Sequence, residues 1–168
     1  MTVYWMPPPY PMCRLPLAVL LFSVPALPLR AQTFDLRSAF DTASRQTLPS
    51  AARQIEYHTD VKVTVEVDAA SLGHDEKAWG NLSIIANRIV GAFDDVGRDQ
   101  VGKDALDREV KHVLIVKLPD GQEDAVQLQG HILYVRTSAS DKAMVVLQNI
   151  IIAALEQALQ TGHPPPTP

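Results

Sequence analysis

Cysteine is almost absent from this chain: Cys13 is the only one among 168 residues. Because Cys13 lies in a segment predicted to be a signal peptide, the mature chain has none. Disulfide bonds, thiol chemistry and a cysteine-based zinc site are therefore excluded, and the core alone must hold the folded part together. An exported domain without disulfides is more typical of a bacterial periplasm than of a eukaryotic secretory route.

The predicted signal peptide covers residues 1–31. Residues 15–26 form an apolar run behind Arg14, and Ala26 or Ala31 provides the small residue that ends a cleavage site. The run is too short and too often interrupted by proline to span a membrane, for which about 20 apolar residues are needed. We therefore expect a periplasmic or secreted protein with no membrane span in its mature form.

Met12 is the start that we expect for this leader. Met12, Cys13 and Arg14 begin a more ordinary leader than the proline-rich segment before them. A lipid-anchored cysteine would follow the apolar run, so Cys13 is not expected to anchor the mature protein.

Basic residues are too few to favour nucleic-acid binding. The chain has 15 Lys and Arg against 19 Asp and Glu. Arg14 and Arg30 leave with the leader, so the mature chain has 13 basic and 19 acidic residues and a formal charge of −6. An acidic surface repels phosphate backbones, and we expect no nucleic-acid partner.

Internal repeats are lacking as well, and low-complexity sequence is confined to the proline-rich ends. Removing 31 of the 168 residues leaves 137, enough for one domain that buries about two-thirds of its unfolded surface. We predict a single domain over residues 32–162 and a disordered tail at 163–168.

The clearest pattern in the chain is an alternation over residues 55–68, with apolar or β-branched side chains at odd positions and polar ones at even positions. A period of two is typical of a strand with one buried face. Such a strand would reach ~46 Å, longer than usual. We therefore expect it to bend, with residues 61–67 paired and residues 55–60 forming an edge that meets a partner.

The remaining elements follow from hydrophobic periodicity, capping residues and turn residues. Helices are predicted from the Asp35 cap to Pro49, over Trp79–Val96 with Gly97 as the stop, over Gln100–Val110 with Asp99 as the cap and Val101, Ala105 and Leu106 turned inward, and over Asp141–Leu159. Strands are predicted over 113–118, 125–128 and 131–136.

The order α-β-α-α-β-β-β-α predicts an α+β fold: a two-layer domain of about four mostly antiparallel strands with helices on one face. Val113 and Ile115, and likewise Ile132 and Tyr134, alternate with apolar neighbours, so both faces of the sheet are expected to be apolar. The first helix or a docking partner must then cover the second face.

The last helix is apolar over most of its circumference. Its polar residues form one narrow stripe that includes Lys142, Asn149 and Glu156. Burial against the sheet is the preferred interpretation, and a homodimer through Val145 and Ile152 is the alternative.

Catalytic motifs are lacking. Residues 97–104 have the spacing of a phosphate-binding loop, but Asp104 stands where a Ser or Thr ligates magnesium, so a helix stop and a helix start are expected instead. Ser71, His74 and Asp75 provide the residue types of a triad at a spacing that suits a helix cap. The sequence favours a non-enzymatic protein without deciding the question.

Metal binding is the main chemical alternative. His58 and Asp60 lie two apart on the polar face of the predicted strand, and they suit zinc or copper. A complete site needs His112 or His131 from a neighbouring strand, and a solvated polar face is the simpler interpretation. No cofactor is predicted.

Two hypotheses result. The first is a non-enzymatic binding or accessory protein of the cell envelope, such as an inhibitor or an immunity-like factor, with a protein partner. The second is a metal-binding protein or metal-dependent hydrolase that uses His58 and Asp60. The candidate partner-binding residues are Glu56, His58, Asp60, Lys62, Val113, Ile115, Ile132 and Tyr134.

Overall fold

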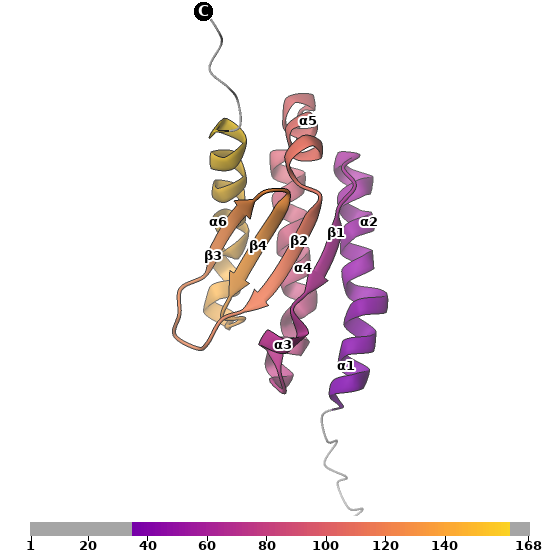
Figure 1. Ribbon diagram of the computed structural model, residues 1–168, viewed down its shortest axis with the longest axis vertical. Helices are drawn as coiled ribbons and strands as arrows, with labels where there is room; N and C mark the ends of the chain where they lie inside the picture. The colour runs from indigo at the N-terminus through magenta and orange to yellow at the C-terminus, as the bar shows by residue number, and fades with distance from the viewer. Residues whose placement is uncertain (1–34, 162–168) are drawn as a thin grey trace, which may run out of the picture. The chain divides into compact units, whose positions relative to one another are not determined.

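The computed structural model describes residues 35–161 (Figure 1). The predicted signal peptide at 1–31, the start at Met12 and the tail at 163–168 lie outside the described residues. Within these residues, helices and strands are built around one four-stranded sheet. The broad prediction of an α+β chain with four strands is confirmed.

The sheet is mixed, so the prediction of a mostly antiparallel sheet is wrong. Its strand order is β1-β2-β4-β3. The β1–β2 and β2–β4 pairs are parallel, and only β3 and β4 are antiparallel. The strands are β1 (Thr64–Val67), β2 (His112–Lys117), β3 (Ala125–Gln129) and β4 (Ile132–Thr137).

The path from β2 to β4 explains the parallel pairing. The loop over residues 118–124 carries the chain past one strand position to the edge, a step of ~10 Å. After the tight turn at Gly130, where φ is +59°, β4 returns between β2 and β3. Periodicity predicts the hairpin, but it does not say which strand becomes the neighbour of β2.

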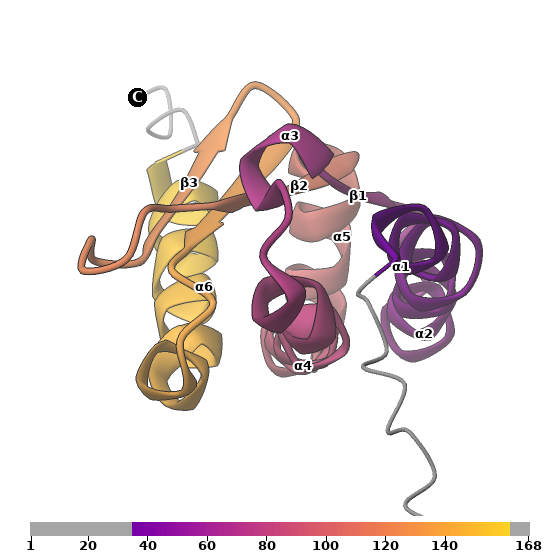
Figure 2. The same cartoon turned by 90° about the horizontal axis from the view of Figure 1, so that it is seen from below.

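Three helical segments form a layer on one face of the sheet (Figure 2). The first is a continuous rod with a π-helical stretch in its middle. The helices are α1 (Leu36–Thr42), the π-helical η1 (Ala43–Thr47), α2 (Leu48–Thr59), α4 (Glu76–Val96) and α6 (Asp141–Thr161), with the shorter α3 (Ala69–Leu72) and α5 (Gln100–Glu109) in the connections. The order therefore differs from the predicted one by the extra helix α3 and the longer first rod.

Pro49, predicted to close the first helix, instead lies in the first turn of α2. Proline is tolerated there because its missing N–H would have no partner in the first turn of a helix. The π-helical stretch immediately before it interrupts the regular α-helical hydrogen bonding. The rod can therefore continue through Pro49.

The first part of the predicted long strand is the end of α2. Leu48, Ala51, Ile55 and Thr59 are buried at helical spacing, whereas Tyr57, which the alternation places inside, is 85% exposed. Asp60 ends the helix in the left-handed conformation at φ +61°. Only Thr64–Val67 remains as strand, so the prediction over residues 55–68 is wrong for its first half.

The core lies between the sheet and the helix layer. Phe93 of α4, Leu147 and Ile151 of α6, and Val113 and Ile115 of β2 are all at most 1% exposed. Helix α6 therefore packs on the core of its own domain, in line with the preferred interpretation of its apolar surface. Val113 and Ile115 belong to the core and do not lie on a partner-binding surface.

The helix caps agree with the sequence. Asp35 accepts a hydrogen bond from the backbone N–H of Arg37 at 3.0 Å, and Asp99 accepts one from Gly102 at 2.8 Å. In α5, Leu106 is buried as predicted, but Val101 is 74% exposed, so its predicted inward position is wrong.

Gly97 ends α4 as predicted, with an ordinary φ of −83°. A Cβ atom at this position would lie 2.8 Å from Cγ2 of Thr59 and 2.9 Å from the carbonyl oxygen of Phe93. Glycine is therefore required by the close approach of α2 to the end of α4.

Candidate functional site

The face of the sheet that points away from the helix layer has no described element over it (Figures 1 and 2). Alternation along the strands turns Val65, Val113, Ile115, Leu133 and Val135 toward the helices. The alternate residues lie on the other side. We call this surface the open sheet face and define it by Thr64, Glu66, His112, Leu114, Val116, Ile132, Tyr134 and Arg136.

Strand register arranges these side chains in cross-strand rows. Thr64, His112 and Ile132 form one row, and Glu66, Leu114 and Tyr134 form the next. The apolar members on β2 and β4 are half-buried by their neighbours, whereas Thr64 and Glu66 on the edge strand are exposed. The result is an apolar centre with a polar rim on the β1 side.

Three rim residues contact one another. Oγ1 of Thr64 lies 2.8 Å from Nδ1 of His112, and Nε2 of His112 lies 3.5 Å from Oε2 of Glu66. A hydroxyl, an imidazole and a carboxylate in this order are the components of a catalytic triad. Here they lie on a flat sheet face, and none of the larger cavities of the described residues is lined by them. The contacts hold the imidazole in place without providing an enclosed reaction site.

Arg136 and Tyr134 form the other polar feature of this face. The guanidinium of Arg136 lies 5.0 Å from the centre of the Tyr134 ring, within the range of a cation–π contact. Among the described residues, no carboxylate lies within ion-pair distance of Arg136. The stacked pair therefore keeps a positive charge beside the apolar centre.

The polar residues that were predicted to form one row on a strand do not lie on the open sheet face. Glu56 and His58 lie on α2, Asp60 is its C-cap, and Lys62 follows in a loop. Lys62 pairs with Glu56 at 3.5 Å, and Asp60 pairs with Lys103 at 3.1 Å. Each pair includes one largely exposed side chain, Lys62 in the first and Asp60 in the second, so each contributes little stability.

The metal hypothesis has no complete ligand set in the described part of the chain, where no group of three or more His, Cys, Asp or Glu residues is arranged to hold an ion. Nδ1 of His58 lies 3.8 Å from Oδ1 of Asp94. The predicted strand that was to align His58 with Asp60 is a helix end. His112 does lie near an acidic residue across strands, Glu66, but the described part of the chain places no second acidic group beside it.

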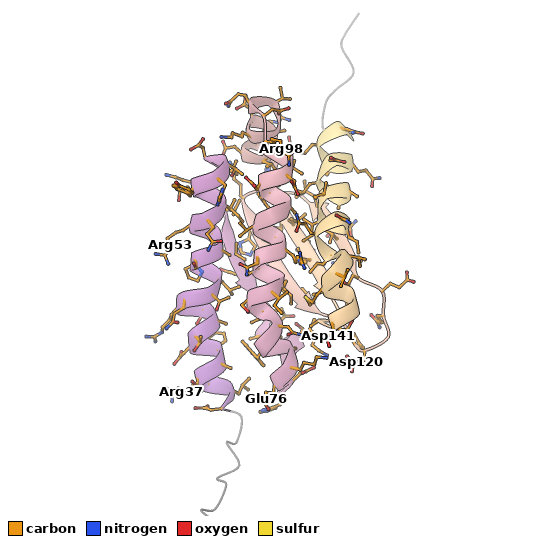
Figure 3. The ribbon with its side chains drawn as sticks, turned by 180° about the vertical axis from the view of Figure 1, so that it is seen from behind. Arg37, Arg53, Glu76, Arg98, Asp120 and Asp141 are labelled. Atoms are coloured by element: carbon orange, nitrogen blue, oxygen red, sulfur yellow. The ribbon has the colours of Figure 1, made fainter. Side chains whose placement is uncertain are left out.

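A cavity of about 720 Å³, which the residue patterns did not predict, lies at the carboxyl ends of β2 and β4. Its lining includes Asp75, Lys77, Asp124, Val146 and Ile150. Figure 3 shows Glu76, Asp120 and Asp141 at the same end of the domain. The acidic segment after β2 and the Asp before α4 were the available signal, but they were interpreted as a turn and a cap.

Two carboxylates in this cavity have defined environments. The backbone N–H of Ala78 donates to Asp75, and this bond, aided by Lys117 at 3.2 Å, lowers the pKa of Asp75. One oxygen of Asp124 accepts from the N–H of Ser138 at 2.9 Å, while its other oxygen is buried and has no hydrogen-bond partner within residues 35–161. The cavity is acidic and wide, and Asp75 is occupied as a helix cap.

The two motif-like segments are structural, as expected. Residues 97–104 end α4 and begin α5, and Asp104 accepts a hydrogen bond from Gln100 at 2.7 Å. The hydroxyl of Ser71 donates to the carbonyl of Asp68 and accepts from the N–H of Lys117. Both segments therefore contribute hydrogen bonds at the ends of helices and strands.

The fold and this surface define a class: a two-layer domain with a mixed four-stranded sheet, helices on one face and an open second face. Comparisons of the chain with protein-family models, with curated proteins and with solved structures found no match. None of the described helices is long and apolar enough to cross a membrane.

Proposed function

We propose that this protein is an exported, non-enzymatic binding domain whose open sheet face docks a protein partner of the cell envelope. The observation that supports this most is the apolar centre formed by Leu114, Val116, Ile132 and Tyr134, which none of the described elements covers (Figure 1). A contiguous apolar surface that the domain leaves uncovered is typical of an interaction site. Export is proposed from the leader-like residues 1–31.

The composition of the face favours a protein partner over a small molecule. Protein interfaces combine an apolar centre with a polar rim, and tyrosine and arginine are enriched among the residues that dominate binding energy. Tyr134 and Arg136 are stacked and thus preorganised for such contact. Because Arg136 has no acidic partner among the described residues, the partner is expected to place a carboxylate there.

Site-specific photo-crosslinking tests this proposal. A benzoylphenylalanine in place of Tyr134 should crosslink one defined envelope protein in producing cells. The matched control replaces Tyr57, which is 85% exposed but lies on α2 in the helix layer. Equal crosslinking from both positions, or none from Tyr134, contradicts docking at the open sheet face.

Affinity measurement with the crosslinked partner provides the second part of the test. Tyr134→Ala and Arg136→Ala should each weaken binding at least tenfold, which corresponds to about 1.4 kcal/mol. Tyr57→Ala should leave the affinity unchanged. Cell fractionation and N-terminal sequencing of the mature protein test export separately.

Two weaker proposals remain from the sequence. One is a homodimer through Val145 and Ile152. Only Val145 is largely exposed, at 72%, because Ile152 packs partly against the core. The other is metal binding at His58 and Asp60. His58 lies beside Asp94 and Asp60 beside Lys103, so the two residues do not share one set of ligands. The open sheet face is the better-supported surface.

A further inference from the structure

Strand β3 is an edge of the sheet that lacks the usual protection against pairing. Among the described residues it pairs only with β4. Its sequence, Ala-Val-Gln-Leu-Gln, has no charge, proline or glycine. Natural edge strands are usually protected by such residues or by a covering element, because their free N–H and C=O groups can pair with another strand. The opposite edge strand, β1, is shorter and carries Glu66.

A groove of about 430 Å³ runs beside this edge, between β3 and α6. Ala154 and Ala158 line it from the helix, one turn apart. Ile150 and Val146 continue the same line of the helix and border the neighbouring acidic cavity. Residues four apart share one helix face, so α6 presents an apolar row, Val146, Ile150, Ala154 and Ala158, next to β3.

We infer that a second copy of this chain occupies this edge. Strand β3 and helix α6 lie side by side and run in the same direction (Figures 1 and 2). A two-fold axis perpendicular to the sheet reverses both elements. One rotation therefore pairs β3 antiparallel with its copy and packs α6 antiparallel on its copy, which is a closed, isologous contact.

Charge favours a copy of the same chain at this position. Self-pairing places like residues opposite one another, and like charges across strands destabilise a sheet. Strand β3 has no charge to oppose. Among the described residues, the one charged residue that lines the groove, Arg136, lies on β4, one strand in from the edge, opposite Ala125. On α6, Glu156 lies two residues from Ala154 and hence on the opposite side of the helix from the apolar row.

The dimensions of the two elements also match. The apolar row spans ~18 Å along the helix and β3 spans ~17 Å. One strand and one helix row provide fewer residues than the ~20–30 per side of a standard interface. The dimer is therefore reversible, with a Kd in the micromolar range.

Sedimentation velocity of the full-length chain, carrying Cys13→Ser, measures the dimer from about 1 µM to about 1 mM, a range that covers micromolar affinities. Gln127→Lys on β3 and Ala154→Glu in the groove should each weaken dimerisation at least tenfold. The matched controls are Thr64→Lys on the opposite edge strand and Ala153→Glu, an exposed neighbour on α6. Both controls should dimerise like the parent.

Disulfide crosslinking gives a readout that does not depend on weakened variants. In the Cys13→Ser background, Gln127→Cys should form a covalent dimer on oxidation, and Thr64→Cys should not. A chain that stays monomeric over the whole range, or a dimer that loses no affinity with Gln127→Lys and Ala154→Glu, overturns the inference. These measurements use the purified chain alone, so they are independent of docking at the open sheet face.

Discussion

The steric requirement at Gly97 leads to a quantitative prediction about stability. Gly97→Ala adds one methyl group that would lie 2.8 Å from Cγ2 of Thr59 and 2.9 Å from the carbonyl oxygen of Phe93. Since φ is −83° at Gly97, alanine has no conformational penalty there. The whole effect is overpacking, which typically costs about 1–3 kcal/mol.

Gly80→Ala, inside the helix α4 that Gly97 terminates, is the matched control. Position 80 is exposed, and a Cβ atom there meets nothing within 4 Å. Alanine in place of glycine inside a helix stabilises by about 0.5–1 kcal/mol. The two substitutions are chemically identical, so the structure predicts opposite signs and a difference of about 1.5–4 kcal/mol between them.

Urea unfolding followed by circular dichroism measures both free energies of unfolding. The slope with denaturant should stay constant, so that a shift in midpoint reports stability alone. If Gly97→Ala is as stable as Gly80→Ala, the close approach of α2 to the end of α4 is wrong. The packing of Thr59 against Gly97 would then need to be revised.

Three further predictions concern stability and ligands. Asp75→Ala should cost about 1 kcal/mol at pH 7 through the lost cap; because the pKa of Asp75 is lowered in the folded state, this cost should shrink as pH falls below the ordinary value of 3.8, and a cost independent of pH contradicts the assignment. Phe93→Ala should cost about 3–5 kcal/mol, since Phe93 is fully buried, and a loss under 1 kcal/mol places it outside the core. Added zinc or copper should leave the melting temperature unchanged, and a rise that His58→Ala abolishes supports the metal hypothesis instead.

Local sequence patterns predicted most helices and strands, but they did not predict which strands pair with one another. Asp35 and Asp99 are caps because their side chains satisfy free N–H groups, a purely local effect. Ile55 and Thr59 lie four residues apart, a spacing that fits both a period of two and a period of 3.6, and only Tyr57 between them separates the two patterns. The helical spacing of the buried residues from Leu48 to Thr59 favours a helix. This spacing can be recognised only if Pro49 is accepted as part of the helix.

The candidate site was predicted in part for the same reason. Ile132 and Tyr134 were chosen because apolar residues occupy both faces of β4, and they lie on the open sheet face. Val113 and Ile115 have the same alternation on β2 but point inward, and nothing local distinguishes the two faces. His112 gains its contacts with Thr64 and Glu66 from strand register, which depends on the long connection between β1 and β2. Arg136 contacts Tyr134, which lies two residues away on the same strand, once β4 is formed.

The position of β4 between β2 and β3 affects how the chain folds during synthesis, when its N-terminal part appears first. Strand β2 can pair with β1 early, but its second neighbour, β4, comes last among the described strands. Until Ile132–Thr137 has emerged, β2 has an unpaired apolar edge, and pairings between distant segments form slowly. The final step, insertion of β4 together with α6, closes the sheet and the core at once, so truncation before Ile132 should produce an aggregation-prone chain.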